Sequence, residues 1–274
     1  MSVEGAMTPL PPPAEDRLDE ESLLAAQGYR LLSIASPLAL LVLWEISVRL
    51  GVVDARFFPA PSSVAATLWS MARSGELWLH TEASLIRLFW GFLVGGIPAL
   101  GLGIAMGLSP ALRAIVEPLI AATYPIPKSA IMPLILLIFG LGEASKVVMV
   151  AIGVFFPVAM NAVTGVLEIN RIYLDVGRNY QASRWQVFRT IALPGALPFI
   201  MTGIKLGVGL GLILIAISEM LGARSGLGYL IWNAWEILDV NAMYVGLFMI
   251  ALIGFLLTHL LNALERWLVP WKSP

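Results

Sequence analysis

The residues of this chain that could do chemistry are few, and the charged ones stand out because they interrupt apolar segments. Lys128 and Lys205 lie inside long hydrophobic runs, and Ser218 and Glu219 end one of these runs. A charge near the centre of a bilayer costs on the order of 2.5–3.5 kcal/mol, so an intramembrane charge is a functional candidate by default. The two lysines could assist the passage of an anion, or they could snorkel or form structural ion pairs.

Composition places these residues in a membrane protein. The 274 residues are 58% hydrophobic and 13% charged, with a mean hydropathy of +0.84. The net charge of −1 gives no basic excess that would favour nucleic acid, and two histidines without cysteine offer no usual metal or disulfide framework. We therefore expect no cofactor in this chain and no nucleic-acid partner.

Uncharged runs predict an all-α integral membrane protein with about six transmembrane helices. A run of 25 residues such as 88–112 forms about 37 Å of helix, which crosses a hydrocarbon core of about 30 Å. The predicted spans are about 31–50, 84–110, 113–142, 145–168, 196–221 and 241–265, within a membrane domain over residues 31–274. The acidic, proline-containing segment 1–30 predicts a disordered tail, because a secretory signal would be basic and then apolar.

Lysines and arginines in the loops set the predicted orientation. With a cytoplasmic N-terminus, the inside segments hold nine of the seventeen basic residues and the outside segments hold six, while Lys128 and Lys205 lie within spans. The loop from Arg171 to Arg189 carries four arginines and fixes the side most strongly. An even number of spans then places both termini in the cytoplasm.

Prolines predict a break in the span at 113–142. Pro125, Pro127 and Pro133 each remove a backbone donor, and irregular backbone at membrane depth persists only where protein or a water-filled cavity satisfies the freed carbonyls. The break is either a kink that lines a cavity or one that fits a neighbouring helix.

Glycines recur at helical spacing along the spans, in the sets Gly91/Gly95, Gly103/Gly107 and Gly203/Gly207/Gly211. Such spacing removes side chains from one helix face and lets two backbones approach closely. The face would serve either static packing or sliding during a conformational cycle.

The segment "DVGRNYQASRWQVFRTIALPGALP", from Asp175 to Pro198, is the longest polar interruption in the second half of the chain. Apolar residues alternate in it with arginines, which predicts two short amphipathic helices on either side of Gln181-Ala182-Ser183 and a protein partner in the cytoplasm. Pro194 and Pro198 suit the start of the following span, where the missing donor of proline costs least.

This loop resembles the cytoplasmic signature of binding-protein-dependent ABC importer permeases. That signature has a Glu-Ala-Ala triplet, a glycine four residues later, nine further residues and Ile-x-Leu-Pro, and Ile191, Leu193 and Pro194 match its end. Asp175-Val176-Gly177 stands in place of the triplet. Gln181 stands in place of the glycine, which reaches positive φ more easily. We therefore expect the coupling contact to differ from that of the relatives.

The stretches "YPIPKSAIMPLILLIFGLGEASKV" and "SEMLGARSGLGYLI" extend the resemblance to the nitrate/sulfonate/taurine/bicarbonate branch of these permeases. The resemblance implies a type I ABC importer permease fold in the bacterial inner membrane, with a cytoplasmic coupling helix in the loop 170–194. It also implies a homodimer of permeases, two ATP-binding subunits that hold ATP and Mg²⁺, an external solute-binding protein and a small anionic solute.

Candidate residues fall into two roles, one implied by the resemblance and one by the charges and prolines at membrane depth. For coupling to the ATPase they are Asp175, Val176, Gly177, Arg178, Tyr180, Gln181, Ala182, Ser183, Arg184, Val187, Phe188, Ile191, Leu193 and Pro194. For the translocation pathway or its gate they are Pro125, Pro127, Lys128, Lys205, Ser218 and Glu219. Glu219 and the glycine-rich loop after it would form an outer gate or a docking surface for the binding protein, or an ordinary tight turn.

Two other classes of protein compete with this interpretation. An ion-coupled secondary transporter would need more spans or an inverted repeat, and a membrane-embedded enzyme would need a convergent polar cluster; neither His80 nor His259 has a visible partner in the sequence. The phosphate-loop pattern G-x-x-x-x-G-K-[ST] is missing from the sequence, so we expect no enzymatic activity in this chain and ATP hydrolysis by a partner.

Overall fold

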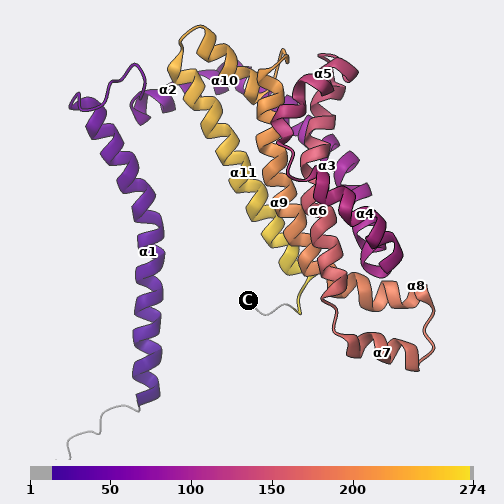
Figure 1. Cartoon of the computed structure of the whole chain (residues 1–274). Coiled ribbons are helices and arrows are strands. Elements are labelled where there is room, and N and C mark those ends of the chain that lie inside the picture. The colour runs from indigo at the N-terminus through magenta and orange to yellow at the C-terminus, as the bar shows by residue number, and fades with distance from the viewer. Residues whose placement is uncertain (1–13, 272–274) are drawn as a thin grey trace, which may run out of the picture. The chain divides into compact units, whose positions relative to one another are not determined.

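The computed structural model describes residues 14–271, apart from the side chains of residues 14–28, 30, 31, 34, 171, 174, 178 and 184. Within these bounds the structure is all-α and forms no strand, which confirms the predicted fold class (Figure 1). The chain divides into two compact units, residues 1–63 and residues 64–274.

The helices follow one another in this order: α1 (Ala14–Arg49), α2 (Pro61–Ser74), α3 (Glu76–Leu108), α4 (Pro110–Thr123), the 3₁₀ helix η1 (Lys128–Ile131), α5 (Met132–Phe139), α6 (Glu143–Leu167), α7 (Arg171–Asn179), α8 (Arg184–Val187), the π-helix η2 (Phe188–Ala192), α9 (Leu193–Met220), α10 (Leu227–Glu236) and α11 (Val240–Leu268).

Helix α1 makes up most of the first unit. It begins at Ala14, inside the segment 1–30 for which the sequence predicted a disordered tail; residues 1–13 lie outside the described residues. The segment "AEDRLDEESLLAAQ" is rich in Ala, Leu and Glu, which have high helix propensity, and this explains the earlier start. At the other end of α1, Arg49 pairs with Glu45 at 2.6 Å.

Helix α6 is the centre of the second unit and packs between α3 and α9. A β-carbon added at Gly95 of α3 would lie 2.7 Å from the Ala151 Cα, and one added at Gly203 of α9 would lie 2.9 Å from the Pro157 carbonyl oxygen. Both distances are too short for real side chains, so only glycine permits this approach of backbones. The helix faces that carry the glycine repeats therefore pack closely, which agrees with the predicted static packing. Sliding of these faces during a conformational cycle stays a prediction.

Helices α2, α3, α10 and α11 together form a hydrophobic core, separate from the contacts of α6 with α3 and α9. Met71 of α2 and Leu77 of α3 pack there with Leu227, Leu230 and Val245. Helix α2 begins at Pro61 and ends at Ser74. Gly75, with a φ of 86°, separates it from α3, so residues 76–80 belong to α3 rather than to α2.

Four of the described helices are long and apolar enough to cross a membrane: α3, α6, the segment Trp185–Met220 that contains α9, and α11. Helix α4 and the segment Lys128–Phe139 pass the same test together, but they are bent by 85° and count as a fifth span only if the pair is one broken span. The predicted number of about six is thus not confirmed, and 31–50 is not among these candidates.

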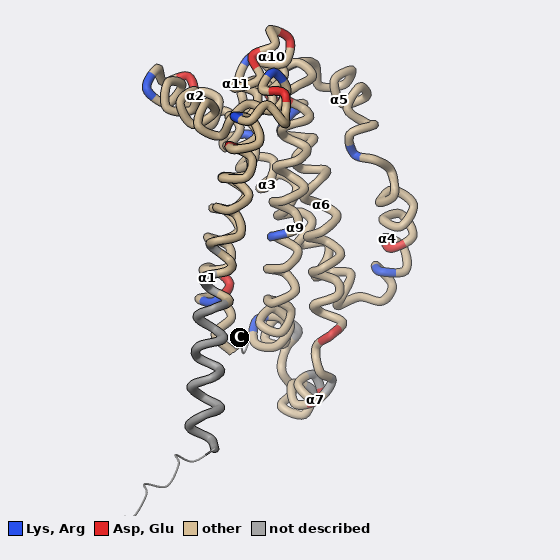
Figure 2. Tube along the Cα trace, turned by 90° about the vertical axis from the view of Figure 1, so that its left-hand side faces the viewer, with Lys and Arg blue, Asp and Glu red and all other residues tan. Residues whose placement is uncertain are grey.

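The two ends of the second unit carry different elements. Helix α7 lies at one end of the bundle, whereas α5 and α10 lie at the other (Figures 1 and 2). Figure 2 shows that charged residues are few along the middle of α3, α6 and α9 and gather toward the ends. This distribution is typical of a bundle whose middle lies in hydrocarbon.

Candidate functional site

The polar loop predicted at 170–194 folds into a helical hairpin, which we call the α7–α8 hairpin (residues 171–192). As predicted, two short helices lie on either side of the Gln181-Ala182-Ser183 turn. The Gln186 N donates to the Ser183 Oγ at 3.3 Å, and the Ser183 N donates to the Gln186 Oε1 at 2.7 Å. These reciprocal bonds form a capping box that begins α8.

Gln181 adopts the left-handed backbone that the glycine of the family signature reaches easily. Its φ is 51°, and the Ala182 N donates to the Gly177 carbonyl oxygen at 2.9 Å, which closes the end of α7 in a Schellman motif. A residue with a β-carbon costs roughly 1–2 kcal/mol in this region. The substitution at this position therefore stores strain in the turn without abolishing the left-handed geometry.

Gly177, which stands at the last position of the family triplet, is buried where α7 approaches the rest of the hairpin. A β-carbon there would lie 3.1 Å from the Ile191 Cδ1 and 3.5 Å from the Val187 Cγ2. The glycine thus lets α7 lie against α8 and η2. Val187, Phe188 and Ile191 are half-buried and hold the hairpin together from inside.

The outer surface of the hairpin is aromatic. Tyr180 is 83% exposed and Trp185 is 67% exposed, and the Trp185 ring stacks on Phe188 at a centroid distance of 5.2 Å. Asp175 and Arg189 are also exposed. Tyr180, Val187 and Phe188 are among the predicted coupling residues, and of these three Tyr180 is the exposed one. Trp185 was not predicted, although it lies three residues before Phe188.

The other predicted coupling residues lie on the surface of the hairpin or at the start of α9. Val176 is exposed, Ala182 is half-buried, and Leu193 and Pro194 begin α9, with Pro194 in the first turn as predicted. The side chains of Arg178 and Arg184 lie outside the described residues. Between α8 and α9 the Leu193 N donates to the Phe188 carbonyl oxygen within the π-helix η2, a rare element that is frequent at functional sites.

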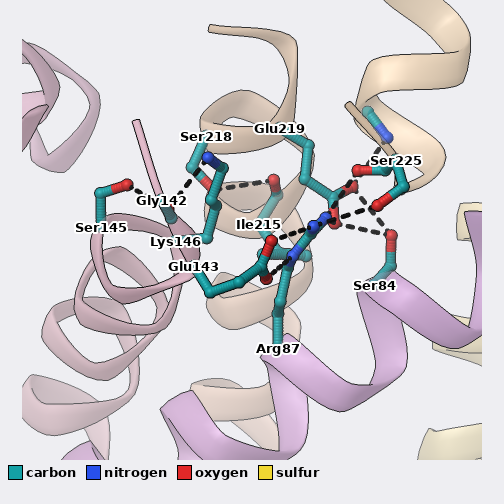
Figure 3. A network of polar contacts seen from close by, with 12 residues as sticks. Ser84, Arg87, Gly142, Glu143, Ser145, Lys146, Ile215, Ser218, Glu219 and Ser225 are labelled. Carbon is teal, nitrogen blue, oxygen red and sulfur yellow. Dashed lines mark hydrogen bonds and ion pairs between the residues drawn. The ribbon is translucent and has the colours of Figure 1, made fainter. Parts of the chain in front are cut away.

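A cluster of four charged residues, Arg87, Glu143, Lys146 and Glu219, is here called the buried charged cluster because all of its members except the exposed Glu143 are buried (Figure 3). It lies at the end of the bundle opposite the hairpin. The Arg87 Nη1 donates to the Glu219 Oε1 at 2.8 Å, and the Arg87 Nε and Nη2 donate to the two Glu143 oxygens at 2.5 and 2.7 Å. Helices α3, α6 and α9 each contribute to this cluster, so it ties their ends together.

Neutral groups complete the bonding around Glu219. The Ser84 Oγ lies 2.8 Å from one Glu219 oxygen, and the Gly228 N donates to the same carboxylate at 2.9 Å. The Leu227 N donates to the Ser84 Oγ at 2.8 Å, and the Gly226 N donates to the His80 Nδ1 at 3.2 Å. Hydrogen bonds at this density repay the cost of burying a carboxylate.

Sequence reasoning missed most of this cluster. Arg87 and Lys146 were counted among the six basic residues on the outer side, and no partner was predicted for His80. A signal was present, because His80, Ser84 and Arg87 recur at helical spacing on one face of an apolar helix. Their partners could not be inferred, since they belong to segments far along the chain.

The predicted gate residues Ser218 and Glu219 are both buried. A role of Glu219 in an outer gate or a docking surface stays a prediction. Its side chain has no exposed surface. The reason is that its carboxylate is enclosed by donors from α3 and α10. The Ser218 Oγ donates to the Ile215 carbonyl oxygen of its own helix at 3.0 Å.

The predicted pathway lysines have partners that account for their positions. Lys205 of α9 forms an ion pair with Glu265 of α11. The Lys128 Nζ donates to the Thr123 and Tyr124 carbonyl oxygens at 2.9 and 3.0 Å and lies 4.1 Å from the Phe156 ring centroid. The break at Pro125 and Pro127, both exposed, thus has its freed carbonyls satisfied by a side chain. A role of these residues in a pathway stays a prediction.

The fold defines a class, the all-α membrane proteins built on a bundle of long apolar helices. The structure is similar to a chain of the MetNI methionine ABC transporter in an inward-facing conformation, with a TM-score of 0.53. The sequences are 21% identical, and the match covers 73% of this chain and 96% of that chain. At this identity the similarity concerns the fold.

The family model described as "Binding-protein-dependent transport system inner membrane component" matches residues 97–274, and the chain belongs to this family. The taurine transport system permease protein TauC of Escherichia coli is 37% identical over 88% of this chain and 90% of its own length. The putative aliphatic sulfonates transport permease protein SsuC of the same organism is 34% identical over 86% and 90%.

The riboflavin transport system permease protein RibX of Chloroflexus aurantiacus is similarly close, with 36% identity over 85% of this chain and 87% of its own length. The chain is therefore a permease subunit of an ABC importer and a multi-pass protein of the inner membrane. Nothing in these relationships favours an ion-coupled secondary transporter.

Proposed function

We propose that this permease carries a small anionic solute of the taurine or sulfonate class. The observation that supports this substrate is that relatives named for taurine or aliphatic sulfonates match the chain over most of their length at 32–37% identity. Riboflavin is the second candidate, because the relative named for it is 36% identical. Nitrate and bicarbonate, which the sequence also suggested, are not named in the relatives reported above.

A second copy of the chain would complete the pathway. Helices α3, α6 and α9 approach each other at glycines so closely that no solute can pass between them. The solute must therefore cross along a face of this bundle, and a homodimer supplies the opposite wall. Lys128 and Lys205 stay candidates for attracting the anion. To do so, Lys128 would give up its bonds to the Thr123 and Tyr124 carbonyl oxygens, and Lys205 would give up its ion pair with Glu265.

The α7–α8 hairpin is the proposed coupling element for an ATPase subunit that holds ATP and Mg²⁺. Exposed Tyr180 and Trp185 offer the apolar anchors that partner surfaces favour, and Asp175 and Arg189 lie beside them for charged contacts. Two hairpins in a homodimer would bind two such subunits, and the resemblance also suggests contacts from Arg178 and Arg184. A solute-binding protein would act at the other end.

Co-purification tests the coupling element. We expect Asp175→Ala combined with Tyr180→Ala to reduce the amount of ATPase subunit retained with the permease by about tenfold, since interface anchors of this kind contribute on the order of 1–2 kcal/mol or more. Trp235→Ala, an exposed aromatic residue of α10 at the other end of the bundle, is the matched control. Equal retention by both variants would remove the hairpin from the coupling role.

Thiol labelling tests the orientation. The chain has no cysteine, so single introduced cysteines report without background. If the hairpin and both termini lie in the cytoplasm, Ser183→Cys reacts with an impermeant maleimide only in inside-out vesicles and Glu236→Cys reacts only in intact cells. The reverse pattern would invert the proposed topology.

Uptake competition tests the substrate. The permease, its ATPase and its binding protein are expressed together, and accumulation of radiolabelled taurine is measured in the presence of excess methanesulfonate or riboflavin. We expect competition by the sulfonate and none by riboflavin. Competition by riboflavin alone would support the second candidate instead.

A further inference from the structure

The buried charged cluster is not explained by coupling to an ATPase, because it lies at the opposite end of α6. Glu143 is the first residue of α6, whereas the hairpin follows its last turn; a helix of 25 residues separates them by about 37 Å. The cluster instead connects the α5–α6 connector, residues 140–142, with the α9–α10 loop, residues 221–226. Both segments lie at this end of the bundle.

Lys146 holds these two segments against each other. Its side chain is 1% exposed, and its Nζ donates to the Leu141 carbonyl oxygen, to the Gly142 carbonyl oxygen at 3.0 Å and to the Gly222 carbonyl oxygen at 3.0 Å. Two of these acceptors belong to the connector and the third belongs to the loop. A single ammonium group thus joins the end of the bent α4–α5 pair to the end of α9.

Arg87 joins the same two segments through its other contacts. On one side it binds the Glu143 carboxylate in a bidentate pair beside the connector. On the other side its Nη1 donates to the Ser225 carbonyl oxygen at 2.6 Å and its Nη2 donates to the Ser225 Oγ at 3.2 Å. Figure 3 shows the guanidinium between Glu143 on one side and Glu219 with Ser225 on the other.

The two ion pairs of Arg87 differ in the free energy needed to separate them, because one carboxylate is buried and the other is exposed. The side chains of Arg87 and Glu219 are 4% and 0% exposed, so separating them would strand a buried charge. The Glu143 side chain is 69% exposed and would pass into solvent. Arg87 would still keep Glu219 and Ser225 as partners, which leaves no orphaned charge. Of the two ion pairs of Arg87, the one with Glu143 is therefore the easier to open; the Lys146 bond to the Gly222 carbonyl oxygen also has to break before the connector leaves the loop.

The loop side of the cluster is built to stay in place. A β-carbon at Gly226, which has a φ of 117°, would overlap the Glu219 carboxylate, so the loop lies directly on that group. The Gly228 N at the start of α10 also donates to Glu219. Because α10 and the loop are fixed to α9 in this way, the connector is the part that can move.

We propose that the Arg87–Glu143 pair and the Lys146 bond to the Gly222 carbonyl oxygen together form the latch of an outer gate. The connector is held on the α9–α10 loop while both contacts are formed, and α5 is released when both open. The proposal rests on the proposed function, in which this end faces the solute-binding protein. Glu143 and Arg87 act as positioning residues, since neither is argued to touch the solute. Docking of the binding protein would favour the open pair, and the hairpin would report the opening to the ATPase.

The test measures ATP hydrolysis by the purified permease–ATPase complex in lipid nanodiscs, with and without the solute-binding protein. Glu143→Gln keeps the shape of the side chain and removes its charge, and Glu82→Gln, an exposed acid on the same end of α3, is the control. We expect Glu143→Gln to raise hydrolysis without binding protein about fivefold or more, because the closed state loses an ion pair that the open state lacks. Glu82→Gln should behave as wild type.

A second measurement applies even if Glu143→Gln assembles poorly. Glu143→Cys and Ser225→Cys place thiols where both native side chains contact the Arg87 Nη2, at 2.7 and 3.2 Å. A short bifunctional thiol reagent should lock the gate and abolish stimulation by the binding protein, whereas the same double variant without the reagent should hydrolyse ATP at the raised rate expected of Glu143→Gln. Full stimulation after cross-linking would overturn the latch.

The outcomes separate the two levels of inference. If the wild-type complex shows no hydrolysis stimulated by a binding protein, the proposed function fails. If wild type is stimulated but Glu143→Gln hydrolyses ATP like Glu82→Gln, the function stands and the latch fails.

Discussion

The close approach of α3 and α6 predicts that one added methyl group at Gly95 strongly destabilises the permease. A β-carbon there would lie 2.7 Å from the Ala151 Cα and closer still to the Ala151 carbonyl oxygen. These are backbone atoms, which cannot turn aside as a side chain can, so the two helices would have to separate. Gly101 of the same helix has no heavy atom within 4 Å of such a carbon and is the matched control.

The expected difference between the two variants is large. Overpacking costs typically about 1–3 kcal/mol, and we place Gly95→Ala at the upper end because the obstruction is backbone. Gly101→Ala should gain up to about 1 kcal/mol, because alanine favours helix over glycine. The free energy of unfolding should therefore differ by about 3–4 kcal/mol between the variants, more than a hundredfold in the folded-to-unfolded ratio.

Reversible unfolding of the purified chain in mixed micelles measures this difference through the fluorescence of its nine tryptophans. The signal should move to a lower denaturant fraction for Gly95→Ala and to an equal or higher one for Gly101→Ala. If the two free energies of unfolding agree within about 0.5 kcal/mol, the size expected of a neutral substitution, the packing of α3 on α6 is not as described.

Three further predictions concern single contacts. Gln181→Gly should stabilise the α7–α8 hairpin by up to about 1 kcal/mol by relieving the positive φ, and Gln181→Val should weaken it, as measured by amide hydrogen exchange in the hairpin. Lys205→Met and Glu265→Gln should each lower the free energy of unfolding by about 1–3 kcal/mol, whereas the double variant should cost less than their sum; additive losses would show that the ion pair is not formed in solution. Lys128→Met should cost about 0.5–1.5 kcal/mol because the Tyr124 carbonyl oxygen loses the lysine donor while the Thr123 carbonyl oxygen keeps the Ile126 N; unchanged unfolding would show that water replaces the lysine.

The sequence by itself determined the class of the molecule, because the signals for class act locally along the chain. Apolar runs longer than a bilayer is thick give spans, and the spacing of Ile191, Leu193 and Pro194 with the arginines around them indicates the coupling loop. The glycine repeats predicted close helix packing, because the spacing that places glycines on one helix face can be read from a short stretch of sequence. The extent of α1 and the 85° bend between α4 and η1 needed the structure, because propensity and proline indicate a boundary but not its angle.

Only the tertiary structure decided which charges meet. Arg87 and Glu219 are separated by 132 residues, and Arg87 and Glu143 by 56, so nothing in their neighbourhoods identifies them as partners. The strain at Gln181 was also out of reach, because a Schellman turn can impose positive φ on a residue whose own preference opposes it. The local sequence indicates where a helix lies and which of its positions are polar. An ion pair in a low-dielectric interior also depends on which helices pack together. That packing is a property of the whole bundle and not of any one segment.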